Sequence, residues 1–143
     1  ARLAMAMGSV GVAQAAVDTS IKYARERTQF GKEIGQFQLI QQMIADMAAN
    51  TEAARFMVYR AMDLLDREGR CNRESSMAKY WATEAAVQVT LKGIQVHGAY
   101  GLSEEYPMER YFRDAVCFLI PDGTTQINQL IVGREMLGFD AFR

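Results

Sequence analysis

Apolar side chains recur along this chain at steps of three and four residues, which is the period of an amphipathic helix. One such stripe covers residues 3–25 and contains a single polar member, Gln14. A second stripe covers residues 36–67 and is followed by Gly69, a residue type that commonly ends helices. The pattern predicts two long helices, joined by a connector over residues 27–35 that has two glycines and no helical period.

The second half of the chain predicts three more helices. We expect the third to begin near Asn72 or Ser75, either of which can cap it, and to end near residue 96. A short fourth helix is expected over residues 106–117, and a last one over residues 124–137. Residues 116–120 alternate weakly enough to leave a short strand open there. The last helix is expected to bury four apolar residues, Ile127, Leu130, Ile131 and Leu137.

Long helices with short connectors favour antiparallel neighbours, so we expect an all-α fold, an up-down four-helix bundle with an extra short helix. Long amphipathic stripes also tend to leave apolar surface uncovered in a domain of 143 residues. A partner is therefore expected, either a second subunit or further domains of the same polypeptide.

Charge and composition narrow the function. The net charge is -1, with 16 basic and 17 acidic side chains spread along the chain, so nucleic acid and anionic membranes are poor candidate partners. The first apolar run imitates a signal peptide, but its helical period continues past Ala16, and we interpret it as a core helix. No apolar stretch is long enough for a membrane span. Two isolated cysteines, Cys71 and Cys117, suggest a reducing compartment.

Metal and serine-nucleophile chemistry find little support. A di-iron bundle needs two Glu-x-x-His pairs, and a zinc site with Cys and His ligands is disfavoured for the same lack of histidines. The chain has one histidine, His97, so no metal site is expected. There is no Gly-x-Ser-x-Gly segment, and His97 has no evident triad. We interpret His97, near the end of a predicted helix, as structural.

Three polar clusters remain: residues 27–31 (RTQFG) with Gln38 further on, residues 95–101 (QVHGAYG), and residues 121–126 (PDGTTQ). Each is open to a structural interpretation as a helix end or connector. Asp122 in particular could cap the last helix, with its carboxylate on the first backbone amides.

In this order and spacing the clusters resemble the acyl-CoA dehydrogenase family, and the resemblance covers essentially the whole chain. Members have an N-terminal helical domain, a middle β-domain and a C-terminal four-helix domain. The resemblance implies that residues 1–143 are the C-terminal domain of a larger enzyme and that the other two domains are absent from this chain. It is carried by Arg-Thr-Gln-Phe-Gly-Lys after the first helix, Phe37-Gln38, Gln95-x-x-Gly98, Glu105-Tyr106-Pro107, Arg113-Asp114-Ala115, Gly123-Thr124, Ile127 and Arg134-Glu135.

The resemblance implies FAD as cofactor and an acyl-CoA substrate. Arg27 matches the arginine that reaches the FAD pyrophosphate of the neighbouring subunit, and a guanidinium fork suits two phosphates. The implied cofactor-binding residues are Arg27, Gln29, Phe30, Gln38, Gln95, Thr124 and Gln126. The residues implied on the acyl-CoA side are Arg2, Gly123 and Arg134.

Asp122 occupies the place of the catalytic base, which in most of the family is glutamate in a Tyr-Glu-Gly-Thr motif. Pro121 here replaces the tyrosine. In this chemistry the carboxylate removes the α-proton of the thioester, and the β-hydrogen leaves as hydride to the flavin. Some members place the base on the first helix, immediately before the residue matched by Arg2; that residue is Ala1, which cannot act. Aspartate bases occur in relatives that act on cyclic acyl-CoA thioesters, which suggests such a substrate.

The function expected is therefore part of an FAD-dependent acyl-CoA dehydrogenase, acting on a fatty or cyclic acyl-CoA and inactive as this isolated chain. The alternatives are a related flavoprotein with an aspartate base, such as a nitroalkane oxidase-like enzyme, and a helical interaction module without chemistry. The resemblance implies a homodimer or homotetramer. The electron acceptor is left open between an electron-transfer flavoprotein and oxygen. The expected location is the bacterial cytoplasm or the mitochondrial matrix.

Overall fold

The computed structural model describes residues 1–139, and it confirms the all-α fold. All five predicted helices are present, and each predicted boundary lies within two residues of the observed one, apart from the alternative start of the third helix at Ser75, which lies three residues too late. In chain order the elements are α1 (Arg2–Glu26), β1 (Thr28–Gln29), β2 (Lys32–Glu33), a 3-10 turn (Ile34–Gln36), α2 (Gln38–Glu68), α3 (Asn72–His97), a second 3-10 turn (Gly98–Leu102), α4 (Met108–Phe118) and α5 (Thr125–Leu137).

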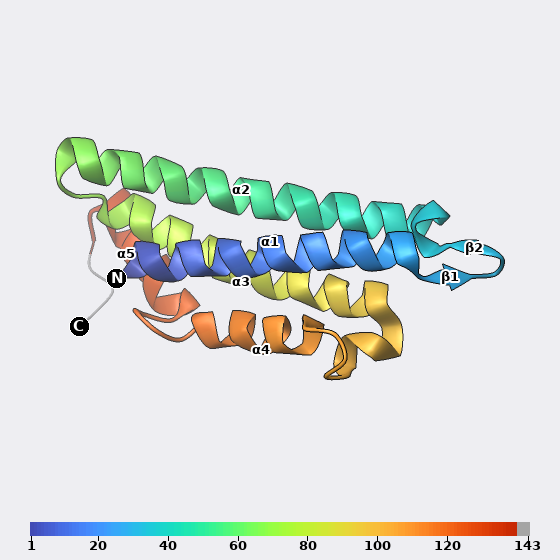
Figure 1. Ribbon diagram of the computed structural model, residues 1–143. Helices are drawn as coiled ribbons and strands as arrows, with labels where there is room; N and C mark the ends of the chain where they lie inside the picture. The colour runs from blue at the N-terminus through green and yellow to red at the C-terminus, as the bar shows by residue number, and fades with distance from the viewer. Residues whose placement is uncertain (140–143) are drawn as a thin grey trace.

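Helices α1 to α4 form the bundle (Figure 1), with α3 in contact with α1, α2, α4 and α5. Small side chains dominate its core, which lets the helix axes approach closely. Two larger side chains, Met47 on α2 and Met108 on α4, are fully buried and fill the remaining space. The buried alanines are Ala6, Ala13, Ala16, Ala24, Ala54, Ala61, Ala78, Ala82, Ala85, Ala86 and Ala115.

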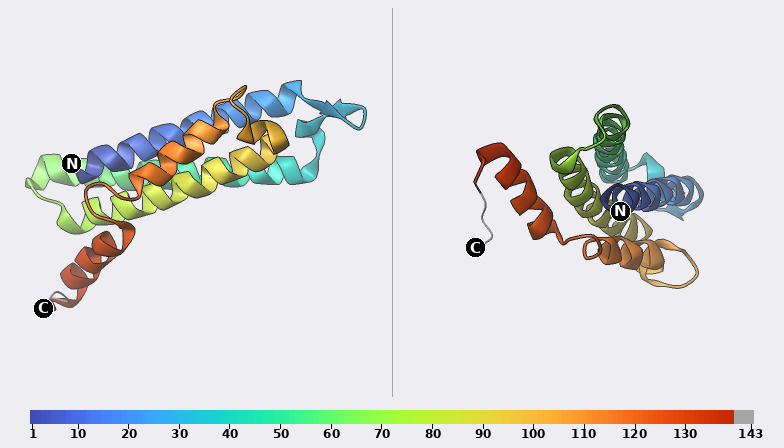
Figure 2. Two further views of the ribbon diagram at one scale, coloured as in Figure 1. Left: turned by 90° about the horizontal axis from the view of Figure 1, so that it is seen from below. Right: turned by 90° about the vertical axis from the view of Figure 1, so that its left-hand side faces the viewer.

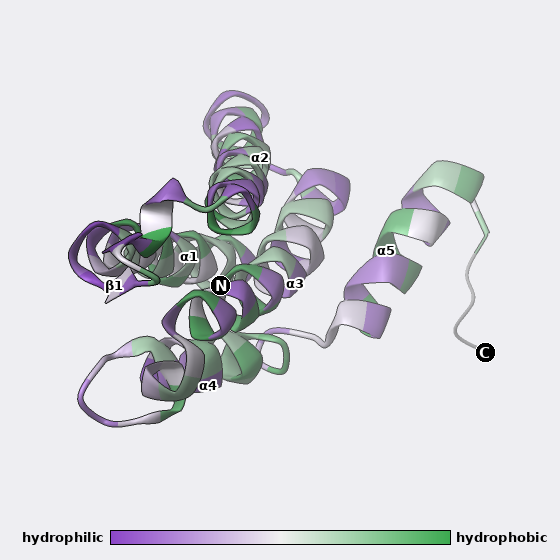
Figure 3. Cartoon of the chain, turned by 90° about the vertical axis from the view of Figure 1, so that its right-hand side faces the viewer, coloured by the Kyte–Doolittle hydropathy of each residue, from purple (hydrophilic) through white to green (hydrophobic). Residues whose placement is uncertain are grey.

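Helix α5 stands apart from the four packed helices and contacts mainly α3 (Figures 2 and 3). The expectation that its apolar residues are buried is wrong. Ile127, Leu130 and Leu137 are 39%, 40% and 72% exposed, and Ile131 is only partly buried. The face that α5 turns to α3 is polar instead, because the two residues buried there are Thr125 and Asn128.

Two further expectations, the cap of α3 and a short strand at the end of α4, are wrong. Neither Asn72 nor Ser75 caps α3; Cys71 occupies the N-cap position without a side-chain hydrogen bond, and the Ser75 hydroxyl donates to the Asn72 carbonyl at 3.2 Å. The weak strand over residues 116–120 is wrong as well, because α4 continues to Phe118 and a turn follows. Gly69 does end α2, with a left-handed φ of 72° that a side chain would strain.

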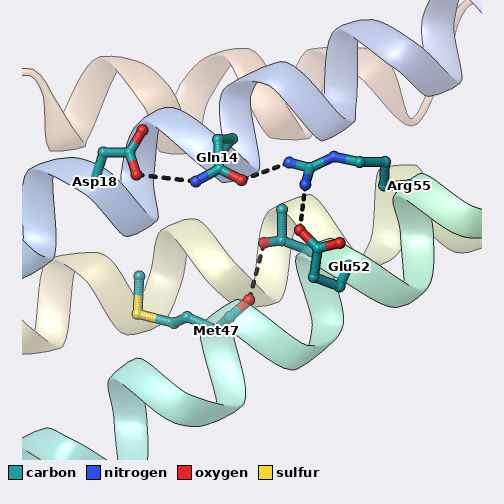
Figure 4. Close-up of polar contacts among 6 residues, drawn as sticks. Gln14, Asp18, Met47, Glu52 and Arg55 are labelled. Carbon is teal, nitrogen blue, oxygen red and sulfur yellow. Dashed lines mark hydrogen bonds and ion pairs between the residues drawn. The ribbon is translucent and has the colours of Figure 1, made fainter.

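Gln14, the polar member of the first stripe, faces α2 (Figure 4). Its amide nitrogen donates to Asp18 Oδ1 at 2.9 Å, and its oxygen accepts from Arg55, which also pairs with Glu52. Both ends of the Gln14 amide are thus satisfied, so a polar residue is tolerated at the interface between the two helices.

Candidate cofactor and catalytic site

The residues singled out from the sequence lie at the two opposite ends of the bundle (Figure 1). One group surrounds the hairpin that follows α1: Arg27, Gln29, Phe30, Gln38 and Gln95. The other surrounds the start of α1 and the α4–α5 turn: Arg2, Asp122, Gly123, Thr124, Gln126 and Arg134. Helix α1 joins the two ends with 25 residues, a length of roughly 37 Å at 1.5 Å per residue. The structure therefore contains two candidate sites rather than one.

The hairpin end presents an aromatic ring to solvent. Thr28 pairs with Glu33 and Gln29 with Lys32, and the two turn residues, Phe30 and Gly31, both have positive φ, 54° and 80°. This is the backbone of a tight hairpin turn, and a left-handed phenylalanine is uncommon there. The Phe30 ring is 92% exposed as a result. Sequence reasoning missed the hairpin because two-residue strands leave no alternating pattern.

A cavity of about 420 Å³ opens beside this hairpin, between the ends of α1 and α3. Its lining includes four of the five residues predicted at this end, Arg27, Gln29, Phe30 and Gln95, while Gln38 lies outside the lining. The Arg27 guanidinium lies 5.6 Å from the centre of the Tyr100 ring. A fixed cation, two amides and several aromatic rings are groups that suit the ADP half of a dinucleotide, so these residues fit FAD.

Two buried side chains form the floor of this cavity. The Tyr23 and His97 rings stack with centroids 4.2 Å apart, and His97 Nδ1 lies 2.7 Å from the Gly93 carbonyl oxygen. Burial lowers the pKa of His97, which favours a neutral ring that donates from Nδ1. Burial also raises the pKa of the Tyr23 hydroxyl. Within residues 1–139, His97 Nε2 is buried without a hydrogen-bond partner.

At the other end, Asp122 lies in the turn between α4 and α5. Its φ is 55°, a left-handed backbone conformation, and Gly123 follows with a φ of 95°. The interpretation of Asp122 as a helix cap is wrong, because Thr124 caps α5 and its Oγ1 accepts from the Ile127 amide at 3.5 Å. Asp122 is exposed, and its carboxylate makes no hydrogen bond to the part of the chain that the structure describes. The carboxylate is left available to a ligand.

Two residues that sequence reasoning missed hold this turn. Lys79 of α3 is fully buried, and its Nζ donates to the carbonyls of Leu119 and Gly123 at 3.0 and 2.7 Å. Asn128 of α5 donates to the Gly123 and Thr124 carbonyls at 2.8 and 3.1 Å. A signal for Lys79 was present: it stands in the helical row of Ser75, Ala82 and Ala86, where every other residue is small and buried.

Burial lowers the pKa of Lys79, and the negative charges of Asp122 and Glu84 act in the opposite direction. Glu84 also accepts a hydrogen bond from the Thr125 hydroxyl at 2.6 Å, which fastens the first turn of α5 to α3. Charged and polar groups of α3 therefore fix the segment that carries Asp122.

The remaining predicted residues at this end are dispersed. Arg2 donates to the Ser76 hydroxyl and, at 3.3 Å, to the Asn72 carbonyl, so it is held against the start of α3. Arg134 lies 3.6 Å from Glu135 on α5. Gln126 is exposed on the first turn of α5. The chain alone does not bring these three side chains together with Asp122.

The described residues show neither a metal site nor a membrane span. Residues 1–139 contain no group of three His, Cys, Asp or Glu side chains placed to hold a metal ion. Over the same residues, no helix combines the length and the apolar character needed to cross a bilayer.

Comparison with known proteins relates this chain to one family. The family described as acyl-CoA dehydrogenase, C-terminal domain, matches residues 1–137. Subunit CarC of the caffeyl-CoA reductase-Etf complex of Acetobacterium woodii is 47% identical over 136 residues, 95% of this chain and 36% of that protein. Cyclohexane-1-carbonyl-CoA dehydrogenase of Geobacter metallireducens is 44% identical, with the same coverage. The chain thus spans about 36% of the length of these relatives.

Solved structures agree in fold. Butyryl-CoA dehydrogenase from Megasphaera elsdenii superposes with a TM-score of 0.93 at 36% identity, over 95% of this chain and 36% of that one. PigA, whose structure was solved with FAD and proline, superposes with a TM-score of 0.90 at 32% identity, over 94% and 35%. Homologous chains with this helical domain are therefore found in FAD-containing proteins.

Proposed function

This chain belongs to the acyl-CoA dehydrogenase family, and we propose that it is the C-terminal domain of an FAD-dependent enzyme that oxidises an acyl-CoA thioester to an enoyl-CoA. The remaining length of the relatives would be an N-terminal helical domain and a middle β-domain. One observation carries the proposal furthest: Asp122 is held in a left-handed turn with an exposed carboxylate, while the neighbouring Thr124 does the helix capping.

Asp122 would act as the base. FAD, when bound, supplies the acceptor for the hydride from the β-carbon. The Asp122 carboxylate oxygen would take the α-proton of the thioester, a transfer that a positioned carboxylate can accelerate by about 10²- to 10⁴-fold. Aspartate is one methylene shorter than glutamate, so the substrate must lie closer to this turn than to a glutamate turn.

The hairpin end would hold the ADP half of FAD. Arg27 would bind the pyrophosphate, since its guanidinium presents paired donors to phosphate oxygens. Gln29 and Gln95 would supply amide hydrogen bonds, and Gln38 would act from the first residue of α2. Phe30, exposed at the hairpin tip, would cover the adenine or ribose face.

The distance between the two sites supports an oligomer. Lys79, which binds the Asp122 turn, and His97, which lines the Arg27 pocket, are 18 residues apart on α3, so the two sites are separated by roughly 27 Å. We infer that the hairpin end serves the cofactor of a neighbouring subunit, in a homodimer or homotetramer. A full-length enzyme that sediments as a monomer with FAD bound would contradict this inference.

The substrate class is proposed from the base and the relatives. An aspartate base and the likeness to cyclohexane-1-carbonyl-CoA dehydrogenase favour a cyclic acyl-CoA. The reverse direction, reduction of an unsaturated acyl-CoA, is a second candidate because caffeyl-CoA reductase is also a relative. That relative is a subunit of an Etf complex, so an electron-transfer flavoprotein is the proposed redox partner. A cytoplasmic location is proposed because the relatives compared are bacterial.

The test is anaerobic mixing of the full-length enzyme with cyclohexane-1-carbonyl-CoA, butyryl-CoA or nitroethane, with flavin absorbance as the readout. We expect bleaching by an acyl-CoA, with cyclohexane-1-carbonyl-CoA the fastest. Reoxidation of the reduced flavin by an enoyl-CoA would show the reductive direction. Bleaching by nitroethane alone would instead support a nitroalkane oxidase-like enzyme, and a full-length protein that binds no flavin would support an interaction module.

A further inference from the structure

We propose that Lys79 is a positioning residue for the catalytic base: its buried ammonium holds both ends of the turn that carries Asp122. The inference rests on the proposed function, because it names a second residue on which the same proton transfer depends.

The geometry of the two Lys79 hydrogen bonds supports the proposal. Leu119 is the residue just past the end of α4, and Gly123 is the last residue before the cap of α5. Their carbonyl oxygens accept from Lys79 Nζ at 3.0 and 2.7 Å. The turn between them, residues 120–122, is thus closed by one cation. A cation at the C-terminal end of α4 is also favoured by the partial negative charge of that helix end.

Asn128 cannot replace Lys79 as the connection between the two ends of the turn. Its amide donates to Gly123 and Thr124, so it fixes only the α5 side of the turn. The Gly123 carbonyl accepts from both side chains, which accounts for both of its lone pairs. Lys79 is the group that joins this fixed point to Leu119, and without it the Leu119 carbonyl loses its hydrogen bond to α3.

The charge of Lys79 has a function beyond packing. Its side chain is fully buried, and a buried ammonium is unfavourable unless hydrogen bonds and opposite charges surround it. Two carbonyls and the negative charges of Asp122 and Glu84 provide those surroundings. Asp122 is thus held near a fixed positive charge, in a left-handed backbone conformation that aspartate tolerates better than most non-glycine residues.

The first test is a double-mutant cycle on flavin reduction in the full-length enzyme. We expect Lys79→Met to slow reduction at saturating substrate by about 100-fold, the cost of a displacement of about 1 Å. FAD content and the affinity for product enoyl-CoA should stay near parental values. On an Asp122→Asn background, Lys79→Met should slow reduction by no more than about 2-fold further, because residues that act as a unit are not additive.

A buried side chain on another helix provides the control. Thr51 is 1% exposed and donates to the Met47 carbonyl within α2, so Thr51→Ala removes a buried group far from the turn. It should slow flavin reduction by the same factor, a few-fold at most, in the parental enzyme and on the Asp122→Asn background. If Lys79→Met slows flavin reduction by the same factor in the parental enzyme and on the Asp122→Asn background, Lys79 acts only on general stability. That result would overturn the proposal.

If Lys79→Met does not fold, Lys79→Gln keeps amide donors without the charge, and it should still slow flavin reduction by at least about 10-fold. A parental rate in this variant would contradict the proposal.

Hydrogen exchange gives a readout that needs no substrate. In the full-length enzyme, amides of residues 119–124 should exchange at least about 10-fold faster in the Lys79 variant, while those of α2 should not change. Unchanged exchange at the turn would overturn the proposal even if activity fell. If none of the acyl-CoA substrates reduces the flavin of the parental enzyme, the proposed function fails. Faster exchange at the turn in the Lys79 variant would still show that Lys79 holds the turn.

Discussion

The ring of Tyr23 on α1 stacks on the imidazole of His97 on α3, and the Tyr23 hydroxyl donates to the carbonyl of the same histidine at 3.3 Å. The Tyr106 ring makes T-shaped contacts with both rings, with centroids 5.2 and 5.5 Å away. Burial lowers the pKa of His97 from its ordinary value of 6.5. This aromatic cluster therefore ties two helices together with a ring that is neutral in the folded chain.

Stability should fall in mild acid because of His97. The unfolded chain takes up a proton on this residue near pH 6.5, whereas the folded chain does so only at lower pH. The contribution is thus fully present above pH 6.5 and is lost as the pH falls below that value towards the folded pKa. We expect the thermal midpoint, followed by circular dichroism, to drop between about pH 7.5 and about pH 5.5.

His97→Phe is the matched variant, since it keeps a stacked ring but cannot titrate. Its midpoint should change less over the same range. Parallel pH profiles for the two proteins would assign the acid sensitivity to other groups.

Arg27→Ala should weaken FAD binding by the full-length enzyme. Hydrogen bonds to a charged group contribute about 1.5–3 kcal/mol, which corresponds to roughly 10- to 150-fold in affinity. Titration of apoenzyme with FAD, followed by flavin fluorescence, measures the change. Arg25→Ala removes an equal charge from an exposed position two residues earlier and should bind FAD normally. Equal losses in both variants would indicate only a long-range charge effect.

Asp122→Asn should slow flavin reduction by substrate at least about 1,000-fold, since amide nitrogen cannot accept the α-proton. The helix that follows should be unaffected, because Thr124 provides its cap. Anaerobic stopped-flow absorbance gives the rate, and FAD should remain bound. Reduction at close to the parental rate would place the base elsewhere in the enzyme.

The isolated chain should not bind FAD tightly or turn over substrate. Its cofactor residues are split between two sites roughly 27 Å apart along α3, and each site offers only part of a binding site. Equilibrium dialysis of the purified chain against FAD should give a dissociation constant weaker than about 1 µM, an affinity that corresponds to -8.2 kcal/mol. Retention of one flavin through purification would be inconsistent with this expectation.

The sequence was informative wherever a residue's role is local. Helical periodicity located all five helices, and Gly69 marked the end of α2 because its left-handed conformation is a local property. The burial of α5 was predicted wrongly because its partner surface is set by tertiary packing. Ile127 and Leu130 remain about two-fifths exposed, while Asn128 is buried against the rest of the domain.

In the candidate sites, too, local features were predicted from the sequence and tertiary arrangements were not. The polar clusters at both ends were visible as motifs, but their separation follows from the direction of α1 and α3 in the bundle, which no motif encodes. Lys79 escaped notice because a single lysine in a helix is usually a solvated side chain. Its burial is explained by groups distant in sequence, above all the carbonyls of Leu119 and Gly123, which lie 40 and 44 residues further along the chain.

The placement of α5 outside the bundle has a consequence for the surface that this helix leaves uncovered. Its polar inner face is anchored to α3 near the first turn, and the Asp122 turn is joined directly to that anchor. Beyond this anchor α5 exposes Leu130, Met136 and Leu137, so a subunit or domain seated on this apolar side would contact the same helix that follows Asp122.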